Sequence, residues 1–268
     1  MAILRIGEYD SLGAVPAYFH LKSTFRQEHW RFAPAAMPDL DRALDRDEVD
    51  VGLVSPLLLA SAPSDFLVLP GLGYAAARHT RDMFLFSDML LDDMDEMTFS
   101  VPGECSASYM LQLVTGRYLQ FQNQFITGWG NAEAFLLVGD HALRERLLAR
   151  YAYVYDLGDL WRHYTGKPMV YLLWAVKKET FRRRREEVRD FHRTLQRGLE
   201  LMRSDWAVTA AKLKGYDWVR SPQTITQLWT SVNYELSPPH YEGLDKFFDD
   251  CAEDGIIEEP PELEYAEV

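Results

Sequence analysis

The sequence predicts an α/β protein with two lobes, and two patterns along the chain support this fold class. Short apolar stretches that end at Gly, Pro, Asp or Ser alternate with helical stretches, as in parallel α/β sheets. The alternation runs through two blocks, near residues 1–87 and 88–175, and helical patterns follow from Lys177 to Phe248. The length of 268 residues suffices for two lobes of roughly 100–150 residues each.

We expect these blocks to form two lobes with a ligand cleft between them. Lobe 1 would consist of residues 1–87 and 177–268, because the C-terminal helices need a sheet to cover, and lobe 2 would consist of residues 88–176. Ligands of such sheets lie at the carboxyl ends of the strands, where loops and helix N-termini meet.

The first block contains three expected strands and two helices. Pro16 fits the first turn of a helix because its missing N–H would be unpaired there. The strands are Ile3–Gly7, Trp30–Ala33 and Asp50–Pro56, and the helices are one that begins near Pro16 and one over Pro38–Arg46.

The remaining elements follow the same reasoning. The acidic end of the chain, Ala252–Val268, has almost no apolar period, so we expect a loosely held tail. The further strands are Phe66–Pro70, Met83–Ser87, Thr98–Pro102, Ala134–Val138, Tyr153–Leu157 and Met169–Val176, and the clearest helices are Tyr109–Phe121 and Ala142–Arg150.

Composition and charge narrow the class of protein. Hydrophobic residues make up 47% of the chain, which excludes a disordered protein. With 28 Lys and Arg against 41 Asp and Glu, the net charge is −13, which argues against nucleic-acid binding. The chain has no signal-peptide pattern and no apolar run of ~18 residues, so we expect a cytoplasmic protein without a membrane partner. The two cysteines, Cys105 and Cys251, are expected to be free thiols in a reducing compartment.

Familiar catalytic motifs are absent from the sequence. It contains no glycine-rich nucleotide loop, no CxxC pair, no HExxH and no GxSxG. None of the seven histidines has a histidine three or four positions away, so a helical zinc site is not expected. The sequence therefore offers no support for a metal or redox cofactor.

The segment Glu104–Ser108 is the most informative one for chemistry. Ser106 and Ser108 lie at an expected junction of strand and helix, beside N–H groups that the helix leaves unpaired. Such a helix start favours a carboxylate through hydrogen bonds and through the helix dipole. The alternative is that one of these serines is simply the N-cap of its own helix.

Other polar and aromatic positions allow a structural and a functional interpretation. Asp140 is either a helix N-cap or a site residue, and Thr165 and Gly166 form either a helix C-cap or a ligand loop. Trp161 and Trp174 are either core residues or ligand platforms. Arg78, His79 and Arg81 form either a solvated loop or a place where an anionic ligand pairs.

Two segments resemble a known family. Ala134–Leu143 (AFLLVGDHAL) and Tyr155–Val176 (YDLGDLWRHYTGKPMVYLLWAV) resemble the chorismate dehydratase family of the futalosine route to menaquinone. The order of Gly-Asp-x-Ala-Leu, Asp-Leu-Gly-x-x-Trp and Thr-Gly-x-Pro carries the resemblance. It spans most of residues 3–250, strongly over 134–176 and weakly before residue 90.

The resemblance implies a fold, a reaction and a set of site residues. The fold would be the two-lobed type 2 periplasmic-binding-protein fold, used as a cytoplasmic enzyme. The reaction would be a hydro-lyase step that converts chorismate to 3-[(1-carboxyvinyl)oxy]benzoate and water, without a metal or organic cofactor. We expect Ser106 and Ser108 to be the catalytic residues. The expected substrate-binding residues are Ser11, Gly13, Ser55, Arg78, His79, Cys105, Ala107, Asp140, Thr165, Gly166 and Trp174.

The chain departs from the family pattern in the part that precedes residue 110. Tyr-Leu-Asn is usual before the first proline, whereas this chain has Ser11-Leu12-Gly13, so the expected amide is missing at Gly13. Ala107 stands where threonine is common. Arg78, His79 and Asp10 are candidates to replace the lost amide, and the general base is open between a side chain and the substrate's own enolpyruvyl carboxylate.

Two alternative functions fit the same fold. One is a cytosolic binding protein for a small carboxylate, and the other is an enzyme like the 1,4-dihydroxy-6-naphthoate synthase of the same route. The second needs a histidine base, for which only His79 and His141 lie near the expected cleft loops. The sequence does not indicate an oligomeric state.

Overall fold

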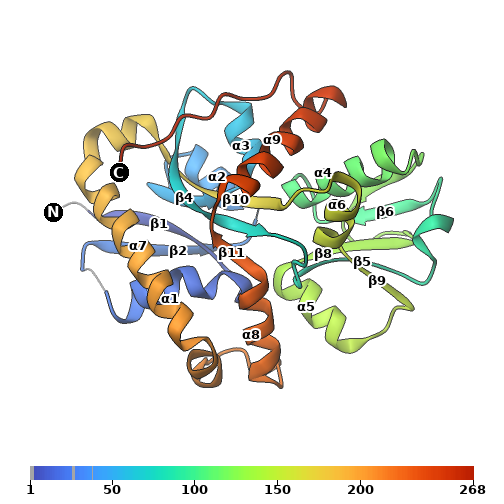
Figure 1. Ribbon diagram of the computed structural model, residues 1–268, viewed down its shortest axis with the longest axis horizontal. Helices are drawn as coiled ribbons and strands as arrows, with labels where there is room; N and C mark the ends of the chain where they lie inside the picture. The colour runs from blue at the N-terminus through green and yellow to red at the C-terminus, as the bar shows by residue number, and fades with distance from the viewer. Residues whose placement is uncertain (1–2, 26–27, 38) are drawn as a thin grey trace. The chain divides into compact units, whose positions relative to one another are not determined.

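Figure 1 shows the computed structural model of the chain, which describes residues 3–25, 28–37 and 39–268. The chain divides into two compact units with discontinuous sequence. Unit 1 contains Met1–Tyr74, Tyr171–Ser237 and Pro261–Val268, and unit 2 contains Ala75–Val170 and Pro238–Pro260. Compared with the expected lobes, residues 75–87 and 238–260 therefore fall in unit 2, and residues 171–176 fall in unit 1.

Within the described residues, unit 1 is built on a six-stranded mixed sheet. Strand β1 is parallel to both β2 and β3, with Ile6 opposite Val51, and β10 is antiparallel to β3. The strands in spatial order are β11 (Val232–Glu235), β4 (Phe66–Ala76), β10 (Met169–Lys177), β3 (Val51–Val54), β1 (Leu4–Tyr9) and β2 (Trp30–Ala35).

Helices cover this sheet through apolar side chains at helical spacing. In α7 (Lys178–Lys212) the buried residues Val188, Phe191, Leu195, Leu199 and Met202 recur every three or four positions. Helix α7 packs against α1, and the two lie side by side in Figure 1. The other helical segments are η1 (Leu12–Ala14), α1 (Val15–Ser23), α2 (Asp39–Asp45), α3 (Pro56–Ser61) and α8 (Pro222–Ser231).

Helix α7 departs from helical geometry at Arg184 and at Asp205. Arg184 bonds the Asp50 carboxylate at 2.9 Å, and Arg5 bonds the same carboxylate at 2.7 Å. Burial alone would raise the pKa of Asp50, but hydrogen bonds from Arg5 and the charges of both arginines outweigh it and lower that pKa. The first bend of α7 is thus tied to the start of β3.

Unit 2 has a five-stranded mixed sheet in the described part of the chain. Strand β8 is parallel to β6 and antiparallel to β5, which in turn is antiparallel to β9. The strands in order are β7 (Gln124–Thr127), β6 (Thr98–Val101), β8 (Ala134–Val138), β5 (Met83–Ser87) and β9 (Tyr153–Asp156). The helical segments are η2 (Leu91–Asp93), α4 (Ser106–Gln112), the π-helical η3 (Leu113–Tyr118), α5 (Gly139–Leu148), α6 (Leu157–Thr165) and α9 (Pro238–Glu253).

The predicted α/β class is confirmed, and several elements are corrected. Strands β7 and β11, each four residues long, were not foreseen. The helix expected over Tyr109–Phe121 is instead α4 followed by η3. Of the helix expected over Pro38–Arg46, Pro38 lies outside the described residues and α2 covers Asp39–Asp45. Cys105 and Cys251 are free thiols, as expected.

The loosely held C-terminal tail was a wrong prediction. Val68 N–H donates to the Glu264 carbonyl at 2.8 Å, and Ala266 N–H donates to the Val68 carbonyl at 2.9 Å. Lys178 pairs with Glu264 at 2.6 Å, and Figure 1 shows the C-terminus beside the first part of α7. Backbone pairing with β4 holds this segment, and a hydrophobic period is not needed for such pairing.

No helix among the described residues is both long enough and apolar enough to cross a membrane.

Candidate functional site

One edge of the unit-2 sheet gathers the ends of four elements. Strands β6 and β8 are parallel, so their carboxyl ends lie at the same edge. Strand β5 begins there, since Met83 is opposite Val138, and β9 ends there, since Asp156 is opposite Phe84. Residues 78–82, 102–108, 139–140 and 156–159 therefore share what we call the unit-2 edge. It brings together the sequence-predicted residues Arg78, His79, Asp140 and Cys105–Ser108.

The serine segment begins helix α4 at this edge. Cys105 is the N-cap, with φ −150° and ψ 163°, so the expectation that a serine caps this helix is wrong. Ser106, Ala107 and Ser108 form the first helical turn and are 3%, 5% and 1% exposed. The Ser108 hydroxyl lies 3.4 Å from the Cys105 thiol. Two hydroxyls are thus buried next to the N–H groups of a helix start.

His79 forms an acid–base pair with Asp159 at the same edge. Its Nδ1 lies 2.7 Å from Asp159 Oδ2, and Arg78 Nε donates to Asp159 Oδ1 at 2.8 Å. The side chains of His79 and Asp159 are 42% and 35% exposed, so the pair is accessible to a ligand. A carboxylate on Nδ1 orients the ring and presents Nε2 as the proton-accepting nitrogen.

The Asp156 carboxylate connects two of the segments at the unit-2 edge. It caps α6 by accepting the Gly158 N–H at 2.9 Å, and it accepts the N–H groups of Thr80 and Arg81, each at 2.9 Å. Arg81 has φ +63°, an unfavourable conformation that these hydrogen bonds hold in place. The Asp-Leu-Gly motif therefore positions the loop that carries His79.

Gly158 is required by the close approach of that loop. A Cβ at residue 158 would overlap the Arg78 carbonyl oxygen and lie 2.8 Å from Thr80 Cγ2. Only a residue without a side chain allows residues 78–80 to pack against the start of α6.

The Thr-Gly-x-Pro motif is the C-cap of α6. Gly166 has φ +70°, and its N–H donates to the Arg162 carbonyl at 3.0 Å. Thr165 Oγ1 donates to the Trp161 carbonyl at 2.7 Å, and Trp161 Nε1 donates to the Pro168 carbonyl at 3.1 Å. Trp161 is fully buried. Thr165 and Gly166 thus have a capping role, which was one of the two interpretations, and we do not carry them into the proposed site.

Asp140 lies in the first turn of α5, but it is not the N-cap. The helix begins at Gly139 after the N-cap Val138, and Gly139 N–H donates to the Asp82 carbonyl at 2.6 Å. This bond ties α5 to the 78–82 loop and leaves Asp140 half-buried at the unit-2 edge.

Unit 1 has an equivalent edge of its own. Strands β1 and β3 are parallel, so Ser11 and Ser55 follow strand ends at the same side of that sheet. Ser55 caps α3 by accepting the Leu57 N–H at 3.2 Å. Ser11 is only 3% exposed, and its Oγ makes no hydrogen bond to any residue that the structure describes. A buried hydroxyl without a hydrogen bond costs free energy. A ligand group that bonds Ser11 would remove this cost.

Two long-range hydrogen bonds hold the turn that follows Ser11. Trp229 Nε1 donates to the Leu12 carbonyl at 2.8 Å, and Tyr234 Oη donates to the Gly13 carbonyl at 2.5 Å. Gly13 is buried in η1.

Trp174, by contrast, lies in the core of unit 1. It is 1% exposed and packs against Tyr18 and Phe191, with ring centroids 5.6 and 5.3 Å away. The packing interpretation applies, so Trp174 is not kept as a substrate contact.

Asp41 is a residue of the unit-1 edge that sequence reasoning missed. Its Oδ1 accepts the Ser55 N–H at 2.8 Å. Burial raises the pKa of the Asp41 carboxyl to about 6, although the Ser55 hydrogen bond and the Arg42 charge act in the opposite direction. No local motif marks this residue, because its partner lies 14 positions further along the chain.

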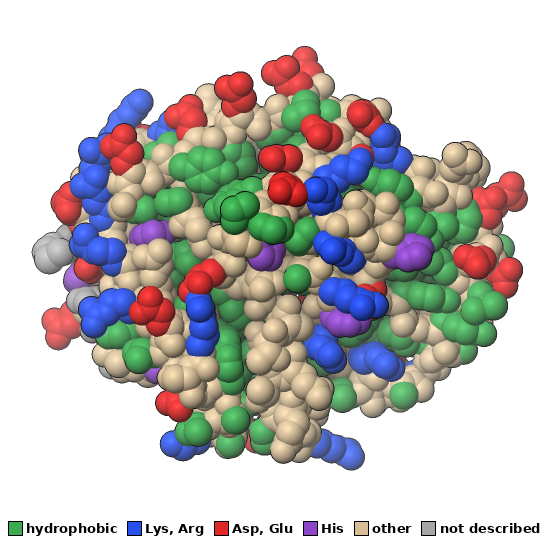
Figure 2. Space-filling view, viewed as in Figure 1, with side chains coloured by type: hydrophobic (Ala, Val, Ile, Leu, Met, Phe, Trp, Pro, Cys, Tyr) green, Lys and Arg blue, Asp and Glu red, His purple; other side chains and the backbone are tan. Residues whose placement is uncertain are grey.

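Basic side chains gather near the unit-2 edge although the whole chain is acidic. Figure 2 shows Lys and Arg side chains over α5 and α6 on the viewed face. Helices α5 and α6 also carry Asp140, Glu145 and Asp159, so the formal charge of each helix is balanced. No group of three or more His, Cys, Asp or Glu side chains suited to a metal ion occurs among the described residues.

Replacing Gly158 by alanine tests the close approach at the unit-2 edge. Because the added methyl group meets backbone, we expect Gly158→Ala to lower the free energy of unfolding by about 1–3 kcal/mol. Gly116→Ala is the control, since a Cβ there has no atom within 4 Å. Urea unfolding of both variants measures the difference, and equal stabilities would contradict the assigned role of Gly158.

The raised pKa of Asp41 predicts a pH-dependent stability. A carboxyl whose pKa rises from 3.8 to about 6 on folding stabilises the fold while protonated, and this contribution is lost as the pH rises through that range. We expect the stability of the natural chain relative to Asp41→Asn to fall between pH 4 and 6 and to level off above. Urea unfolding at several pH values measures it, and a difference independent of pH would contradict the prediction.

The fold is shared with other proteins of known structure. A protein from Archaeoglobus fulgidus is 14% identical with a TM-score of 0.72, over 95% of this chain and 98% of that one. The periplasmic aliphatic sulphonate binding protein SsuA from Escherichia coli is 15% identical with a TM-score of 0.66, over 97% and 95%. A Candida albicans protein described as having the generic periplasmic binding protein fold is 11% identical with a TM-score of 0.70, over 100% and 98%. At these identities the similarity establishes the fold alone, which is the one that the resemblance implied.

The sequence also matches a protein family over nearly its whole length. The family is described as Menaquinone biosynthesis, and the match covers residues 4–253. That range includes both edges described above. The chain therefore belongs to the menaquinone biosynthesis family, on a periplasmic-binding-protein-like fold, and has a role in making menaquinone.

Proposed function

We propose that this protein is a chorismate dehydratase, which converts chorismate to 3-[(1-carboxyvinyl)oxy]benzoate and water. Membership of the menaquinone biosynthesis family supports the pathway. The proposed reaction rests on one observation: the buried residues Ser106 and Ser108 lie at the same edge of the unit-2 sheet as the His79–Asp159 pair. This edge combines hydrogen-bond donors for a carboxylate with a group that accepts a proton.

The donors act on the charge that develops during the reaction. Chorismate is a dianion, and its C3 proton is conjugated through a ring double bond to the ring carboxylate. When this proton leaves, negative charge spreads onto the carboxylate oxygens. That charge is stabilised by Ser106, Ser108 and the N–H groups at the start of α4. These donors are in place before the substrate binds. Arg78 adds positive charge nearby.

His79 is the proposed base. Its Nε2 takes the C3 proton, and the electron pair of the C–H bond enters the ring. The pair is then redistributed as the C4–O bond breaks and the ring becomes aromatic. The departing hydroxide takes that proton back from the His79 ring and leaves as water, so His79 can accept a proton in the next turnover.

The remaining sequence-predicted residues keep smaller roles in the proposal. Asp140, Cys105 and Ala107 border the substrate at the unit-2 edge. The substrate contacts expected of Ser11, Gly13 and Ser55 stay predictions.

One observation favours a second candidate, the 1,4-dihydroxy-6-naphthoate synthase-like activity. That chemistry needs a histidine base, and the His79–Asp159 pair at 2.7 Å offers one. The candidates differ in substrate, because only the dehydratase acts on chorismate. A binding protein for a small carboxylate would bind chorismate and leave it unchanged.

The deciding experiment is to incubate the purified protein with chorismate, without added cofactor, and to analyse the product by chromatography and mass. The proposal expects a product lighter by one water with aromatic absorbance. Chorismate that stays unchanged while raising the melting temperature would support the binding protein instead. If chorismate is neither turned over nor raises the melting temperature, both proposals are contradicted, and the next substrate to assay is that of the synthase.

Ser108→Ala tests the proposed donor. We expect turnover of chorismate to fall about 10–1000-fold, the range for loss of one oxyanion donor. Ser204→Ala is the control, because Ser204 is exposed on α7 and its hydroxyl donates to the Leu201 carbonyl of the same helix. Turnover equal to that of the natural chain would remove Ser108 from the mechanism.

His79→Gln tests the proposed base. We expect a loss in turnover of about 100–10,000-fold, since glutamine retains a hydrogen bond but cannot accept the proton. His163→Gln is the control, because His163 is an exposed histidine on α6 outside the unit-2 edge. If His79→Gln keeps full turnover, the base is the substrate's own enolpyruvyl carboxylate or another group.

A further inference from the structure

Unit 1 contains a cavity that takes no part in the proposed reaction. Its volume is about 320 Å³, and its walls come from α7, α8 and β11. The residues that shape it are Arg203, Trp206, Trp229, Thr230, Tyr234 and Glu235. This volume is at the lower end for small-molecule sites, so it fits a compound with a single ring.

Aromatic rings form the inner wall of the cavity. The Trp206 ring lies 5.9 Å from that of Trp229 and 6.1 Å from that of Tyr234, with interplanar angles of 43° and 30°. Trp229 and Tyr234 are buried, whereas Trp206 is half-buried. Because the rings contact one another, they do not enclose a cage for a cation. The accessible part of Trp206 instead suits a flat ring that stacks on it or meets its edge.

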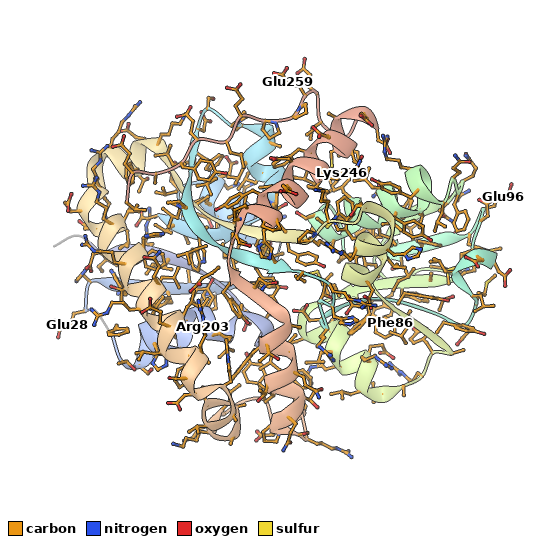
Figure 3. The ribbon with its side chains drawn as sticks, viewed as in Figure 1. Glu28, Phe86, Glu96, Arg203, Lys246 and Glu259 are labelled. Atoms are coloured by element: carbon orange, nitrogen blue, oxygen red, sulfur yellow. The ribbon has the colours of Figure 1, made fainter. Side chains whose placement is uncertain are left out.

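A charged pair stands at the mouth of the cavity. Arg203 pairs with Glu235, and their side chains are 53% and 43% exposed. Figure 3 shows Arg203 on α7, beside α8. An exposed ion pair contributes little to stability, so a ligand carboxylate can replace that of Glu235 on the guanidinium at small cost. The forked donors of arginine match a carboxylate in two hydrogen bonds.

The position of Trp206 depends on a break in its helix. Asp205 has φ −135° and ψ 21°, so α7 leaves helical geometry one residue before Trp206. A regular helix would place residue 206 in a different direction from the one observed. The aromatic wall is therefore a product of this local bend together with α8 and β11.

We propose that this cavity is a second ligand site, specific for small planar aromatic carboxylates. The ring lies against Trp206, and the carboxylate binds Arg203. Two side chains of the cavity wall, Trp229 and Tyr234, donate hydrogen bonds to the Leu12 and Gly13 carbonyls. A ligand in the cavity therefore contacts the side chains that hold the turn after Ser11. The site does not depend on the proposed dehydratase activity, because none of its residues belongs to the unit-2 edge.

The test uses benzoate as the probe and the indole N–H signals of the chain in nitrogen-15 NMR spectra. We expect benzoate to shift the Trp206 and Trp229 signals saturably, with a Kd on the order of 1 mM, as is usual for so small a ligand. Benzamide lacks the charge and cyclohexanecarboxylate lacks the flat ring, so each is expected to bind at least about tenfold more weakly.

Variants locate the binding within the chain. Arg203→Gln, at an exposed position that should not disturb folding, is expected to weaken benzoate about tenfold or more. Trp129→Leu is the control, because Trp129 is 68% exposed and lies in unit 2. Ser108→Ala must leave the Trp206 shift unchanged, which separates this site from the unit-2 edge.

Two results would overturn the proposal. One is the absence of any saturable shift of the Trp206 and Trp229 signals up to about 20 mM benzoate, well above the expected Kd. The other is equal binding of benzoate by the natural chain and by Arg203→Gln. Failure of chorismate turnover would leave the result for this cavity unaffected.

Discussion

The Asp156 carboxylate is the interaction on which the candidate site of unit 2 depends. It accepts N–H groups from the start of α6 and from the 78–82 loop, two segments about 75 residues apart in sequence. Because one carboxylate holds three N–H groups from both segments, no room is left for a side chain between them, and residue 158 is a glycine. The loop held in this way carries His79, and the helix held in this way carries Asp159. The His79–Asp159 pair therefore forms because Asp156 joins the 78–82 loop to the start of α6.

This arrangement changes how the sequence motifs are understood. Asp-Leu-Gly and Thr-Gly-x-Pro carried the resemblance to a family of enzymes, yet in the structure they cap the two ends of α6. These two motifs thus mark a structural feature of the family. They fix the length of α6 and so the distance between the unit-2 edge and Pro168. The groups suited to chemistry lie beside these motifs, in the serine segment and in the 78–82 loop.

Unit 1 uses a different means of holding its edge. There, distant side chains fix the turn after β1, since Trp229 and Tyr234 bond backbone carbonyls more than 200 positions earlier in the chain. The same two side chains form the wall of the cavity beside Trp206. The turn that carries Ser11 and Gly13 is thus supported from a region that a small ligand can reach. In that turn, the buried Ser11 hydroxyl has no hydrogen-bond partner among the described residues.

Local patterns determined much of this protein. Apolar strands followed by polar turns predicted the α/β class and most strands, and turn chemistry predicted the C-cap at Gly166, because each depends on neighbours a few positions away. Only the tertiary structure decided which polar residues meet. His79 pairs with Asp159 across 80 positions, Asp41 receives the Ser55 N–H, and the acidic tail pairs with Val68 in β4. Strand order and register set these contacts, and neither leaves a trace in the spacing of residues along a single sequence.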